Sequence, residues 1–573
     1  MRLSLVILGV LACSEPAPVP RPVIAQPVAI DAAPARHART ISLVGTNDLH
    51  GALTRLPFLA GYVANLRAAR AADGGGVLLV DGGDLFQGTL ESNLAEGADV
   101  VQAYNRLGYA AAAVGNHEFD YGPVGPAVTV QSPSDDPRGA LKARASEAKF
   151  PFLVSNIFDE ATNQRIAWPN MPASTLVEVD GVAIGIIGVS TRSTPYTTMP
   201  ANFVGLRVGP PAESIATEAT ALRAKGAAVI VVVAHIGSKC KNVTDPEDDS
   251  SCDHAEELYP MIAALPEHAV DVIVAGHTHA AIAHRINGIA VIESYSSGRA
   301  FGRVDLQIDA DGHLAKSKIF PPTDLCKAAE PPCETADYEG KPVTPDREVQ
   351  AIVDAALARA GTRRAELLGV TLTAPVIRAH AVESPEGDLF GDLMLAAHPD
   401  AQVAMTNGGG LRADLPAGPL TYGQLYEAMP FDNRFALVDL TGADLRTLVT
   451  KNLERGGGII SWGGLTAKAA CRGSKLDVQL KLAGKPVNDT RMYTLVTSDF
   501  LASGGDGLLA PLKLPKTAIR VTDVIVRDAM AEALRKQRGT IDPAVRFAPR
   551  RLDYPGTRPV RCGKRAVQEP DPE

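Results

Sequence analysis

Five short apolar runs, each leading to residues that can bind a metal ion, constrain the fold of this chain more than any other feature. The runs occupy residues 41–46, 77–80, 111–114, 229–234 and 272–275. Apolar runs of about four to eight residues that are rich in Val and Ile are typical of strands buried on both faces, as in a sheet covered by helices. The sequence therefore predicts an α/β fold with several buried strands.

The residues that follow these runs are histidines, aspartates and an asparagine. They are Asp48, His50, Asp84, Asn116, His117, His235, His277 and His279. Ligands gather beyond the carboxyl ends of the strands in open α/β sheets, so we expect these side chains to lie close together. Imidazole and carboxylate ligands together suit Zn, Mn or Fe, whereas a shell made only of oxygen would suggest Mg or Ca. A metal site at the strand ends is therefore predicted.

Asp84, which follows two glycines, is the candidate for a ligand shared by two ions. Two ions about 3.5 to 4 Å apart can hold both the attacking and the leaving oxygen of an in-line displacement, and a carboxylate can bridge them. Single pieces of the pattern are ambiguous, since Asp48-Leu49-His50 and residues 115–120 are each compatible with an ordinary turn. Their coincidence at five strand ends favours a centre of two divalent ions.

The order of these motifs resembles that of the calcineurin-like metallophosphoesterases. The motifs are Asp-x-His, Gly-Gly-Asp, Gly-Asn-His-Glu-Phe-Asp, a lone His after a Val run, and Gly-His-Thr-His. Residues 406–412, 430–433 and 498–507 are similar to the substrate-binding domain of the 5'-nucleotidase and UDP-sugar hydrolase family. The resemblance runs from about Thr40 to about Asp553. It implies an N-terminal four-layer α/β/β/α metallophosphoesterase domain and a second, mixed α/β C-terminal substrate-binding domain.

The resemblance also implies how the metal centre is built. One ion would be held by Asp48, His50, Asp84 and His279, and the other by Asp84, Asn116, His235 and His277. The two divalent ions, for which Zn, Mn, Co and Fe all fit, would neutralise phosphate oxygens and lower the pKa of a water. A hydroxide held between them would then attack phosphorus.

Two further residues of segment 115–120 are implied to be catalytic. His117 adjoins Asn116 and would stabilise the transition state or protonate the leaving oxygen, a role that suits an imidazole whose pKa lies near ambient pH. Asp120 would accept a hydrogen bond from the other ring nitrogen and so fix the tautomer of His117. The alternative for Asp120 is a turn residue before Tyr121-Gly122.

Substrate recognition is implied to belong to the second domain. Phe431 and Phe500 match the pair between which the family stacks a nucleobase, and a flat π face accepts purines and pyrimidines alike. Asp506 would accept from ribose hydroxyls, Asn407 would contact the base, and Arg412 would bind phosphate through its guanidinium. Each residue alone is also compatible with a core or turn position, and the order of the three motifs favours the binding role.

The chain departs from the family pattern at one place. Many nucleotidases of the family carry an arginine where Val382 stands, and Asn or Arg where Asp388 stands. A missing cation removes a charge-assisted contact to phosphate, typically worth about 1.5 to 3 kcal/mol. Arg378 is a candidate for compensation from nearby. The departure weakens the expectation that AMP is the preferred substrate.

The chain is too long for one hydrophobic core, because domains usually split beyond roughly 250 to 300 residues, and the sequence has 573. We expect a lipoprotein-type signal peptide at 1–13, a Pro/Ala-rich tether at 14–39, the catalytic domain at 40–325, a linker with a helix at 326–364, the substrate-binding domain at 365–555 and a polar tail at 556–573. Helices are predicted at 56–72, 211–225 and 346–360, a polar loop at 131–138, and Pro- and Glu-rich linker sequence at 321–342.

The N-terminus resembles an export signal. Residues 3–12 form an apolar stretch too short to span a bilayer. The segment that ends at Cys13 resembles a lipobox, in which this cysteine would be lipidated; the alternative is a plain cleaved signal with an incidental cysteine. We therefore expect an exported protein of the bacterial cell envelope, anchored by lipid in the periplasm or on the outer membrane.

The six remaining cysteines are also compatible with an oxidising compartment. Their positions suggest the pairs Cys240–Cys252, Cys326–Cys333 and Cys471–Cys562. Other pairings are equally allowed by the sequence, because connectivity cannot be deduced from spacing alone.

Composition narrows the class of partner. The formal net charge of −9 and the lack of a Lys/Arg block argue against a nucleic-acid polymer, which usually requires a basic surface. The resulting prediction is an exported dinuclear phosphohydrolase that removes phosphate from nucleotides. Alternatives are a nucleotide-sugar hydrolase, a 2',3'-cyclic nucleotide hydrolase or a thiosulfohydrolase of the same superfamily. A surface binding protein on an inactive scaffold is the non-enzymatic alternative, and the complete ligand set argues against it.

Overall fold

The computed structural model describes residues 38–327 and 332–563. The predicted signal peptide, with Cys13, and nearly all of the predicted tether lie outside the described residues. Within the described ranges, no helix combines the length and the apolar character that crossing a bilayer would require.

Two six-stranded sheets form the centre of the N-terminal part. In spatial order, the first sheet contains β14 (Leu314–Asp324), β13 (Ala300–Ile308), β1 (Arg39–Thr46), β2 (Gly76–Asp81), β3 (Ala111–Ala113) and β4 (Phe152–Leu153). The second contains β11 (Ala281–Ile286), β12 (Ile289–Ser294), β10 (Val272–Val274), β9 (Val229–His235), β7 (Val182–Ser190) and β6 (Ser174–Val179). Side chains from both sheets, such as Ile41, Val80, Ile184 and Val231, pack into one core. The two sheets therefore lie face to face.

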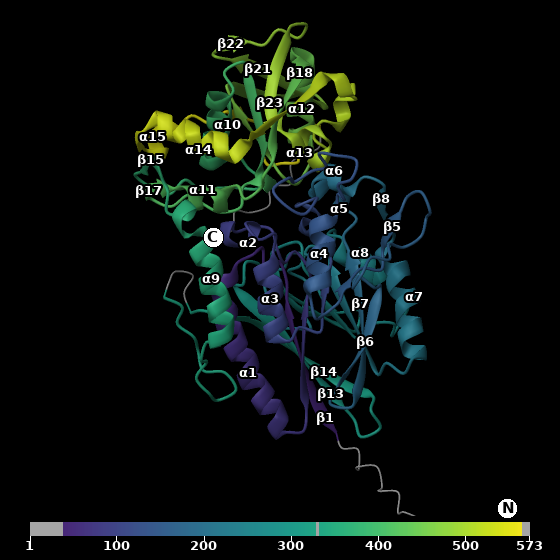
Figure 1. Cartoon of the computed structure of the whole chain (residues 1–573). Helices are drawn as coiled ribbons and strands as arrows, with labels where there is room; N and C mark the ends of the chain where they lie inside the picture. The colour runs from purple at the N-terminus through teal and green to yellow at the C-terminus, as the bar shows by residue number, and fades with distance from the viewer. Residues whose placement is uncertain (1–37, 328–331, 564–573) are drawn as a thin grey trace, which may run out of the picture. The chain divides into compact units, whose positions relative to one another are not determined.

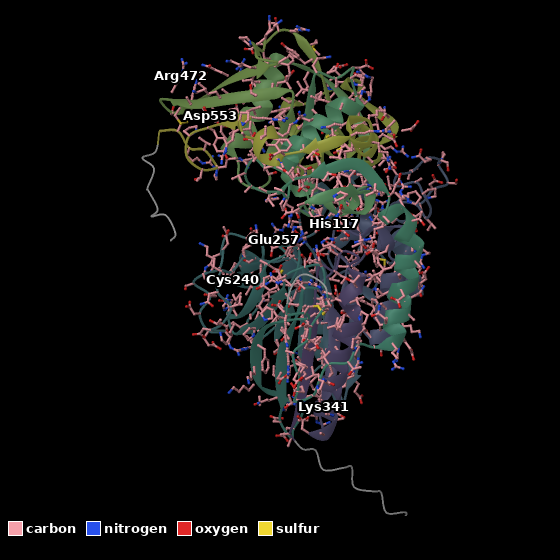
Figure 2. The ribbon with its side chains drawn as sticks, turned by 90° about the vertical axis from the view of Figure 1, so that its left-hand side faces the viewer. His117, Cys240, Glu257, Lys341, Arg472 and Asp553 are labelled. Carbon is pink, nitrogen blue, oxygen red and sulfur yellow. A yellow bond between two sulfur atoms is a disulfide. The ribbon has the colours of Figure 1, made fainter. Side chains whose placement is uncertain are left out.

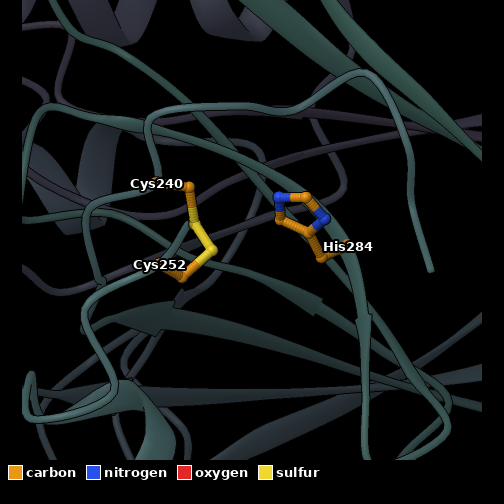
Figure 3. A group of neighbouring side chains, drawn as sticks. All are labelled: Cys240, Cys252 and His284. Carbon is orange, nitrogen blue, oxygen red and sulfur yellow. A yellow bond between two sulfur atoms is a disulfide. The ribbon is translucent and has the colours of Figure 1, made fainter. Parts of the chain in front are cut away.

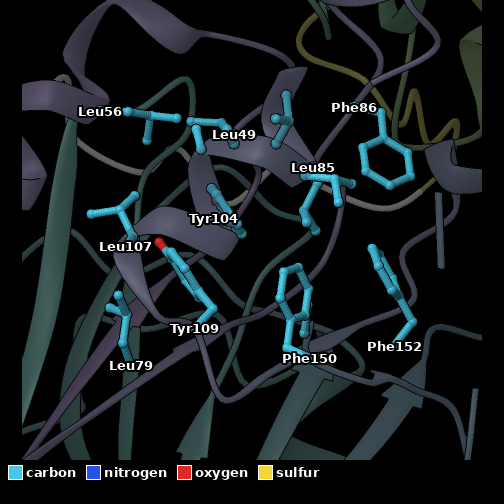
Figure 4. Packing of buried hydrophobic residues seen from close by; sticks show 14 of the residues in the cluster. Leu49, Leu56, Leu79, Leu85, Phe86, Tyr104, Leu107, Tyr109, Phe150 and Phe152 are labelled. Carbon is cyan, nitrogen blue, oxygen red and sulfur yellow. The ribbon is translucent and has the colours of Figure 1, made fainter. Parts of the chain in front are cut away.

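Helices cover the outer face of each sheet, as Figure 1 shows. The first sheet is covered by α1 (Leu56–Ala72), α3 (Ala98–Leu107), α4 (Gly139–Glu147) and α9 (Arg347–Arg364), and the second by α7 (Pro211–Ala224) and α8 (Leu258–Ala263). In α1 the buried side chains Leu59, Tyr62, Val63 and Leu66 recur at helical spacing. Figure 4 shows the packing beneath these helices, where Leu79 of β2 lies near Tyr104 and Leu107 of α3. The predicted α/β/β/α layering is confirmed.

All five predicted runs are strands, namely β1, β2, β3, β9 and β10. The first three are parallel neighbours in one sheet, and β9 and β10 are parallel neighbours in the other. The runs are therefore divided between two sheets instead of sharing one. Parallel strands end at the same edge, so the loops that follow them gather at one end of this body. Figure 2 shows His117 at that end and Lys341 at the opposite end.

The C-terminal part is a mixed α/β body, as predicted. Its central sheet contains β19 (Ile460–Gly463), β16 (Val403–Asn407), β23 (Met492–Ser498), β18 (Arg434–Thr441) and β24 (Ile519–Ile525). One face packs on α10 (Pro385–Ala397), α11 (Tyr422–Ala428) and α14 (Val526–Gln537). The other packs on α12 (Gly442–Glu454) and a small sheet of β22 (Lys485–Pro486), β21 (Lys475–Leu482), β20 (Leu465–Arg472) and β26 (Leu552–Asp553). A third sheet joins β17 (Gly418–Thr421), β15 (Leu367–Leu372) and β25 (Gly539–Ile541).

The segment between the two parts differs from the prediction at its start. Strand β14 runs to Asp324 and includes Pro321 and Pro322, which the sequence had suggested for the linker. Proline lacks the N–H for a central ladder but is tolerated at the edge of a sheet, where β14 lies. The predicted helix is present as α9, and the carboxylate of Asp346 caps it by accepting from the next-turn amides of Glu348 and Val349.

Three disulfides confirm the suggested pairs. They join Cys240 to Cys252, Cys326 to Cys333, and Cys471 to Cys562. The last of them fixes the C-terminal segment to β20, and Val560 beside it is only 4% exposed. The beginning of the predicted polar tail is therefore packed against the domain.

Candidate metal centre and substrate cleft

The predicted ligands form two groups at the ends of the strands. Asp48, His50 and His279 make one group, and Asp84, His235 and His277 make the other, each with ligand atoms within 4.8 Å of one another. The Nε2 atoms of His50 and His279 are 3.0 Å apart, and His279 Nε2 lies 3.4 Å from Asp48 Oδ1. Such converging donor atoms, drawn from imidazole and carboxylate, fit divalent transition-metal ions.

Asp84 lies between the two groups. Its Oδ2 atom is 3.0 Å from Nε2 of His235 and 3.9 Å from Nε2 of His50. Its other oxygen, Oδ1, accepts a hydrogen bond of 2.8 Å from the backbone amide of His117. Because one carboxylate oxygen reaches histidines of both groups, the geometry agrees with the predicted bridging position.

Backbone hydrogen bonds orient two of the histidine rings. Nδ1 of His50 lies 2.8 Å from the carbonyl oxygen of Gln87, and Nδ1 of His235 lies 3.0 Å from that of Gly82. A carbonyl oxygen only accepts, so Nδ1 carries the proton in both rings. Nε2 of each neutral ring is then free to bind a metal ion, which is the usual arrangement around protein metal sites.

Charge and burial shift the pKa values of the central groups in opposite directions. Burial alone would raise the pKa of Asp84, but the nearby His235 and His117 hold it well below its usual range. Burial lowers the pKa of His235, but the Asp84 carboxylate outweighs burial and raises it to about 10. Burial, assisted by the charge of His235, lowers the pKa of His277 to about 3. A divalent cation would take the place of the His235 proton, because metal ligands bind in their deprotonated form.

Glu118 is a site residue that the sequence reasoning missed. Its carboxylate accepts hydrogen bonds from the backbone amides of Asp84, Leu85 and Gly115, at 3.0, 2.7 and 2.7 Å. Burial, reinforced by the charge of Asp84, raises its pKa to about 8. Glu118 thus fixes the loop that carries Asp84. Its position inside the segment 115–120 was the available signal.

Gly115 allows this loop to approach closely. A Cβ atom at this position would lie 2.1 Å from Oδ1 of Asp84, which no real contact permits. Glycine is therefore required where the loop after β3 passes the loop after β2.

The two predicted catalytic residues are in contact. Nδ1 of His117 lies 2.5 Å from Oδ2 of Asp120, which leaves Nε2 for the cleft. Oδ1 of Asp120 accepts from the hydroxyl of Thr198 and the amide of Met199, at 2.9 and 3.1 Å. Burial lowers the pKa of His117, but Asp120 and Asp84 together raise it above its usual value. Asp120 therefore orients the imidazole and is more than a turn residue.

A cavity of about 1200 Å³ brings residues of both parts of the chain together. Its walls include predicted metal ligands, the predicted catalytic pair and all five predicted substrate contacts: His50, Asp84, Asn116, His117, Asp120, His277, His279, Asn407, Arg412, Phe431, Phe500 and Asp506. The two other predicted ligands, Asp48 and His235, are completely buried beneath it. Asn116 reaches His235, with 3.0 Å between Oδ1 and Nε2.

The predicted substrate contacts lie close to the metal ligands. A nitrogen of the Arg412 guanidinium is 3.1 Å from Nε2 of His50, and the rings of Phe431 and His117 are 5.7 Å apart. Asn407 donates a hydrogen bond of 2.7 Å to Asp506, so these two residues act as one polar unit.

The departure from the family pattern has a structural counterpart. Asp388 is buried, and its Oδ2 atom lies 3.5 Å from Nε of Arg551, so a cation inside the C-terminal part faces this carboxylate. Val382 is 52% exposed. Arg378 lines the cavity and donates a hydrogen bond of 3.3 Å to the carbonyl oxygen of Leu411. Its compensating role stays a prediction.

A third group of potential metal ligands is unsuited to a cation. Cys240, Cys252 and His284 lie together in Figure 3, but the two sulfur atoms are bonded to each other. The ring nitrogens of His284 face the carbonyl oxygens of Asp245 and Asn242, at 3.1 and 2.9 Å. Neither thiolate nor ring nitrogen is therefore available for a metal ion.

Comparison with known families agrees with the geometry. Residues 41–281 match the sequence profile of the calcineurin-like phosphoesterases, and residues 366–512 match that of the 5'-nucleotidase C-terminal domain. This chain belongs to the 5'-nucleotidase family of calcineurin-like phosphoesterases. The family consists of metal-dependent hydrolases of phosphoric esters.

Similar proteins have related names. This 5'-nucleotidase family member is 27% identical to protein UshA of Escherichia coli over 508 residues, which cover 82% of this chain and 86% of UshA. It is 25% identical to endonuclease YhcR of Bacillus subtilis over 496 residues, which cover 83% of this chain but only 36% of that longer relative.

Solved structures share the fold. The 5'-nucleotidase precursor of Thermus thermophilus superposes with a TM-score of 0.71 at 24% identity, over 90% of this chain and 99% of that one. The sulfate thiohydrolase SoxB of the same species gives 0.67 at 18% identity, over 90% and 97%. At these identities the likeness establishes the architecture and leaves the substrate open.

Proposed function

We propose that the protein is an exported phosphohydrolase that removes phosphate from nucleotides with the help of two divalent metal ions. One observation carries the proposal: the predicted metal ligands and the predicted nucleoside contacts line the same cavity. A phosphate at the strand ends would lie within reach of Arg412, and a base attached to it would lie beside Phe431. Relatives named 5'-nucleotidase, such as that of Vibrio cholerae, support the choice of substrate class.

The ligand geometry supports a dinuclear centre. Asp48, His50, Asp84 and His279 would hold one ion, and Asp84, Asn116, His235 and His277 the other. When bound, the ions would neutralise phosphate oxygens and lower the pKa of a water so that hydroxide is available near neutral pH. The chain contributes the fixed positions of these donors, which Glu118 and the Nδ1 hydrogen bonds of His50 and His235 maintain.

His117 would serve the leaving oxygen. Its Nδ1 proton is held by Asp120, so its Nε2 atom is the one presented to the cleft. A protonated His117 can donate to the ester oxygen as the bond to phosphorus breaks, and the carboxylate of Asp120 stabilises the cationic ring. The raised pKa of His117 favours that protonated form.

The nucleoside would be held by the C-terminal part. Phe431 and Phe500 offer aromatic faces to the base, and the Asn407–Asp506 pair offers a carboxylate to ribose hydroxyls. The guanidinium of Arg412 lies over the ring of Phe431 at 5.9 Å, which keeps its positive charge beside both base and phosphate.

A second candidate is hydrolysis of a larger substrate, a nucleotide sugar. A cavity of about 1200 Å³ is larger than a mononucleotide needs. The missing cation at Val382 also weakens the case for a terminal monophosphate. A 2',3'-cyclic nucleotide or a thiosulfonate are the remaining substrates within the superfamily.

Export to the cell envelope fits the chemistry of the chain. Three disulfides are formed among the described residues, as expected outside a reducing cytosol. A relative of Listeria monocytogenes, 25% identical to this chain, is named a cell wall protein. The lipid anchor at Cys13 belongs to the same proposal.

Phosphate release from a panel of substrates tests the function. The metal-depleted protein is supplied with Mn²⁺ or Zn²⁺ and with AMP, UDP-glucose, 2',3'-cAMP or bis(p-nitrophenyl) phosphate. We expect turnover of AMP, or of UDP-glucose if the second candidate holds, only after metal is restored. No turnover of any substrate with any metal would overturn the enzymatic proposal and favour a surface binding protein.

A further inference from the structure

One short segment of the N-terminal part touches both the metal centre and the sugar side of the cleft. Residues 193–199 follow β7 and contain α5 (Thr194–Thr197). Polar atoms of this segment contact site residues at three places: Ser193 Oγ lies 3.2 Å from His277 Nε2, Thr197 O accepts from Asn116 at 3.0 Å, and Thr198 Oγ1 donates to Asp120 at 2.9 Å. The backbone of the segment is therefore held in register with the metal centre.

The other side of α5 faces the substrate-binding residues. It lies next to the single turn Gly505–Gly507, which carries Asp506 at its middle. Asp506 has a φ of 53°, a left-handed conformation that presents its side chain to the cleft. Asp506 is the residue expected to accept from ribose hydroxyls.

Tyr196 occupies the middle of α5 and lines the cavity together with Phe431, Phe500 and Asp506. It is 58% exposed, although the residues around it in the segment are largely buried. Among the described residues, its hydroxyl has no hydrogen-bond partner. An exposed aromatic side chain on a fixed backbone, beside a ligand cavity, offers both a flat apolar face and a polar tip.

We propose that Tyr196 is a specificity-determining residue, which covers the sugar of a bound nucleotide from the side opposite Asp506. The inference rests on the proposed nucleotide-hydrolase function and deepens it by assigning a sugar contact to the catalytic part of the chain. Because the contacts of residues 193–199 reach His277, Asn116 and Asp120, the ring is placed at a set distance from the reacting phosphate. Esters that carry a furanose next to the phosphate gain this contact, and simple aryl esters do not.

The test compares three substrates in the variants Tyr196→Ala and Tyr196→Phe. AMP and ribose 5-phosphate carry the sugar, whereas phenyl phosphate lacks it. For Tyr196→Ala we expect KM for AMP and for ribose 5-phosphate to rise roughly 5- to 10-fold, as for loss of one aromatic contact. We expect kcat to stay within about twofold for all three, and KM for phenyl phosphate to be unchanged. Tyr196→Phe should keep most of the affinity, because it keeps the ring.

Matched variants separate this inference from the function on which it rests. Val204→Ala removes another exposed apolar side chain of the same region, 70% exposed and outside the cavity walls, and should change nothing. Phe431→Ala should raise KM for AMP more than for ribose 5-phosphate. If Phe431→Ala leaves KM for AMP unchanged, the nucleoside pocket of the proposed function fails. If Phe431→Ala behaves as expected and Tyr196→Ala does not, only the inference about Tyr196 fails.

Two outcomes for Tyr196→Ala would overturn the proposal. A fall in kcat with all three substrates, phenyl phosphate included, would show that residues 193–199 only position the metal centre. A rise in KM for AMP without a rise for ribose 5-phosphate would show that the ring contacts the base and not the sugar. Unchanged thermal unfolding of the variant shows that the comparison concerns the native fold.

Discussion

Several residues of the centre adopt a backbone conformation that side chains rarely take. Asp48, His50, Asp84, His277 and His279 have φ values of 50°, 49°, 60°, 78° and 56°. Left-handed φ is uncommon outside glycine, and such strain persists only where the surrounding structure fixes it. In this chain the contacts of Glu118 and Gly115 do so for Asp84. The strained backbone turns the side chains back toward one point beyond the strands.

A first prediction concerns Glu118, which binds backbone and not metal. Glu118→Gln replaces an acceptor oxygen by an amide group that cannot accept from Asp84, Leu85 and Gly115 together. We expect metal affinity or kcat to fall about 10- to 100-fold, as for other residues that support metal ligands. Metal content by mass spectrometry and phosphate-release kinetics measure the effect.

Two variants bracket that result. Asp84→Ala, which removes the proposed shared ligand, should abolish turnover and lose more metal than Glu118→Gln. Glu160→Gln, at an exposed position of the same domain, should leave both quantities unchanged. A wild-type metal content in Glu118→Gln, together with wild-type kcat, would contradict the positioning role.

At the scale of elements, α10 shows how burial can override a local sequence signal. The helix begins after Ser384, whose hydroxyl accepts from the amide of Gly387 at 3.2 Å. An acid in the first turn, such as Glu386, ordinarily benefits from the positive end of the helix. Here Glu386 is completely buried, and among the described residues neither of its carboxyl oxygens has a hydrogen-bond partner. Burial, reinforced by Asp414, raises its pKa to about 9.

The sign of the resulting pH dependence follows from linkage. In the unfolded chain Glu386 ionises near its ordinary pKa of about 4.3, whereas in the folded protein it stays protonated up to about pH 9. Between these values the folded state binds the additional proton, so this residue makes stability fall as pH rises, by about 1.4 kcal/mol per pH unit at most. Glu386→Gln should therefore raise the melting temperature at pH 8 and change it little at pH 4.5.

Thermal unfolding of the variant and of the wild type at the two pH values measures this difference. Glu267→Gln, at an exposed position, is the control and should show no pH-dependent gain. An equal shift of the Glu386→Gln variant at both pH values would mean that packing, and not the titration of Glu386, is responsible.

At the scale of the whole molecule, long-range covalent links supplement the packed layers. The Cys471–Cys562 disulfide closes a separation of 91 residues, whereas Cys240–Cys252 closes 12. A longer closed loop removes more entropy from the unfolded chain, so a 100-residue loop is worth about 4.7 kcal/mol and a 15-residue loop about 3 kcal/mol.

Replacement of each pair by serine tests this ordering. We expect Cys471→Ser/Cys562→Ser to lower the free energy of unfolding of the C-terminal part by about 1 to 2 kcal/mol more than Cys240→Ser/Cys252→Ser lowers that of the N-terminal part. Denaturant titrations followed by circular dichroism provide the comparison. The reverse order would show that native contacts around Cys240, and not loop length, dominate.

Local sequence signals were sufficient for the elements that carry the ligands. The Val- and Ile-rich runs predicted β1, β2, β3, β9 and β10, and helical spacing of apolar residues predicted α1, α7 and α9. Pattern reading failed where the edge of a sheet tolerates proline, so β14 extends past Pro321. It also missed Glu118, because hydrogen bonds to backbone amides leave no periodic trace in a sequence.

The sequence by itself determined which residues are available for the site and which strands deliver them, because hydrophobic period and ligand chemistry are local properties. Only the tertiary structure decided that the strands divide between two facing sheets, that Asp84 reaches both ligand groups, and that Tyr196 faces Asp506. These features depend on the left-handed backbone at the ligands and on contacts between residues hundreds of positions apart. Such contacts form only when the separate layers pack, and no short stretch of sequence specifies them.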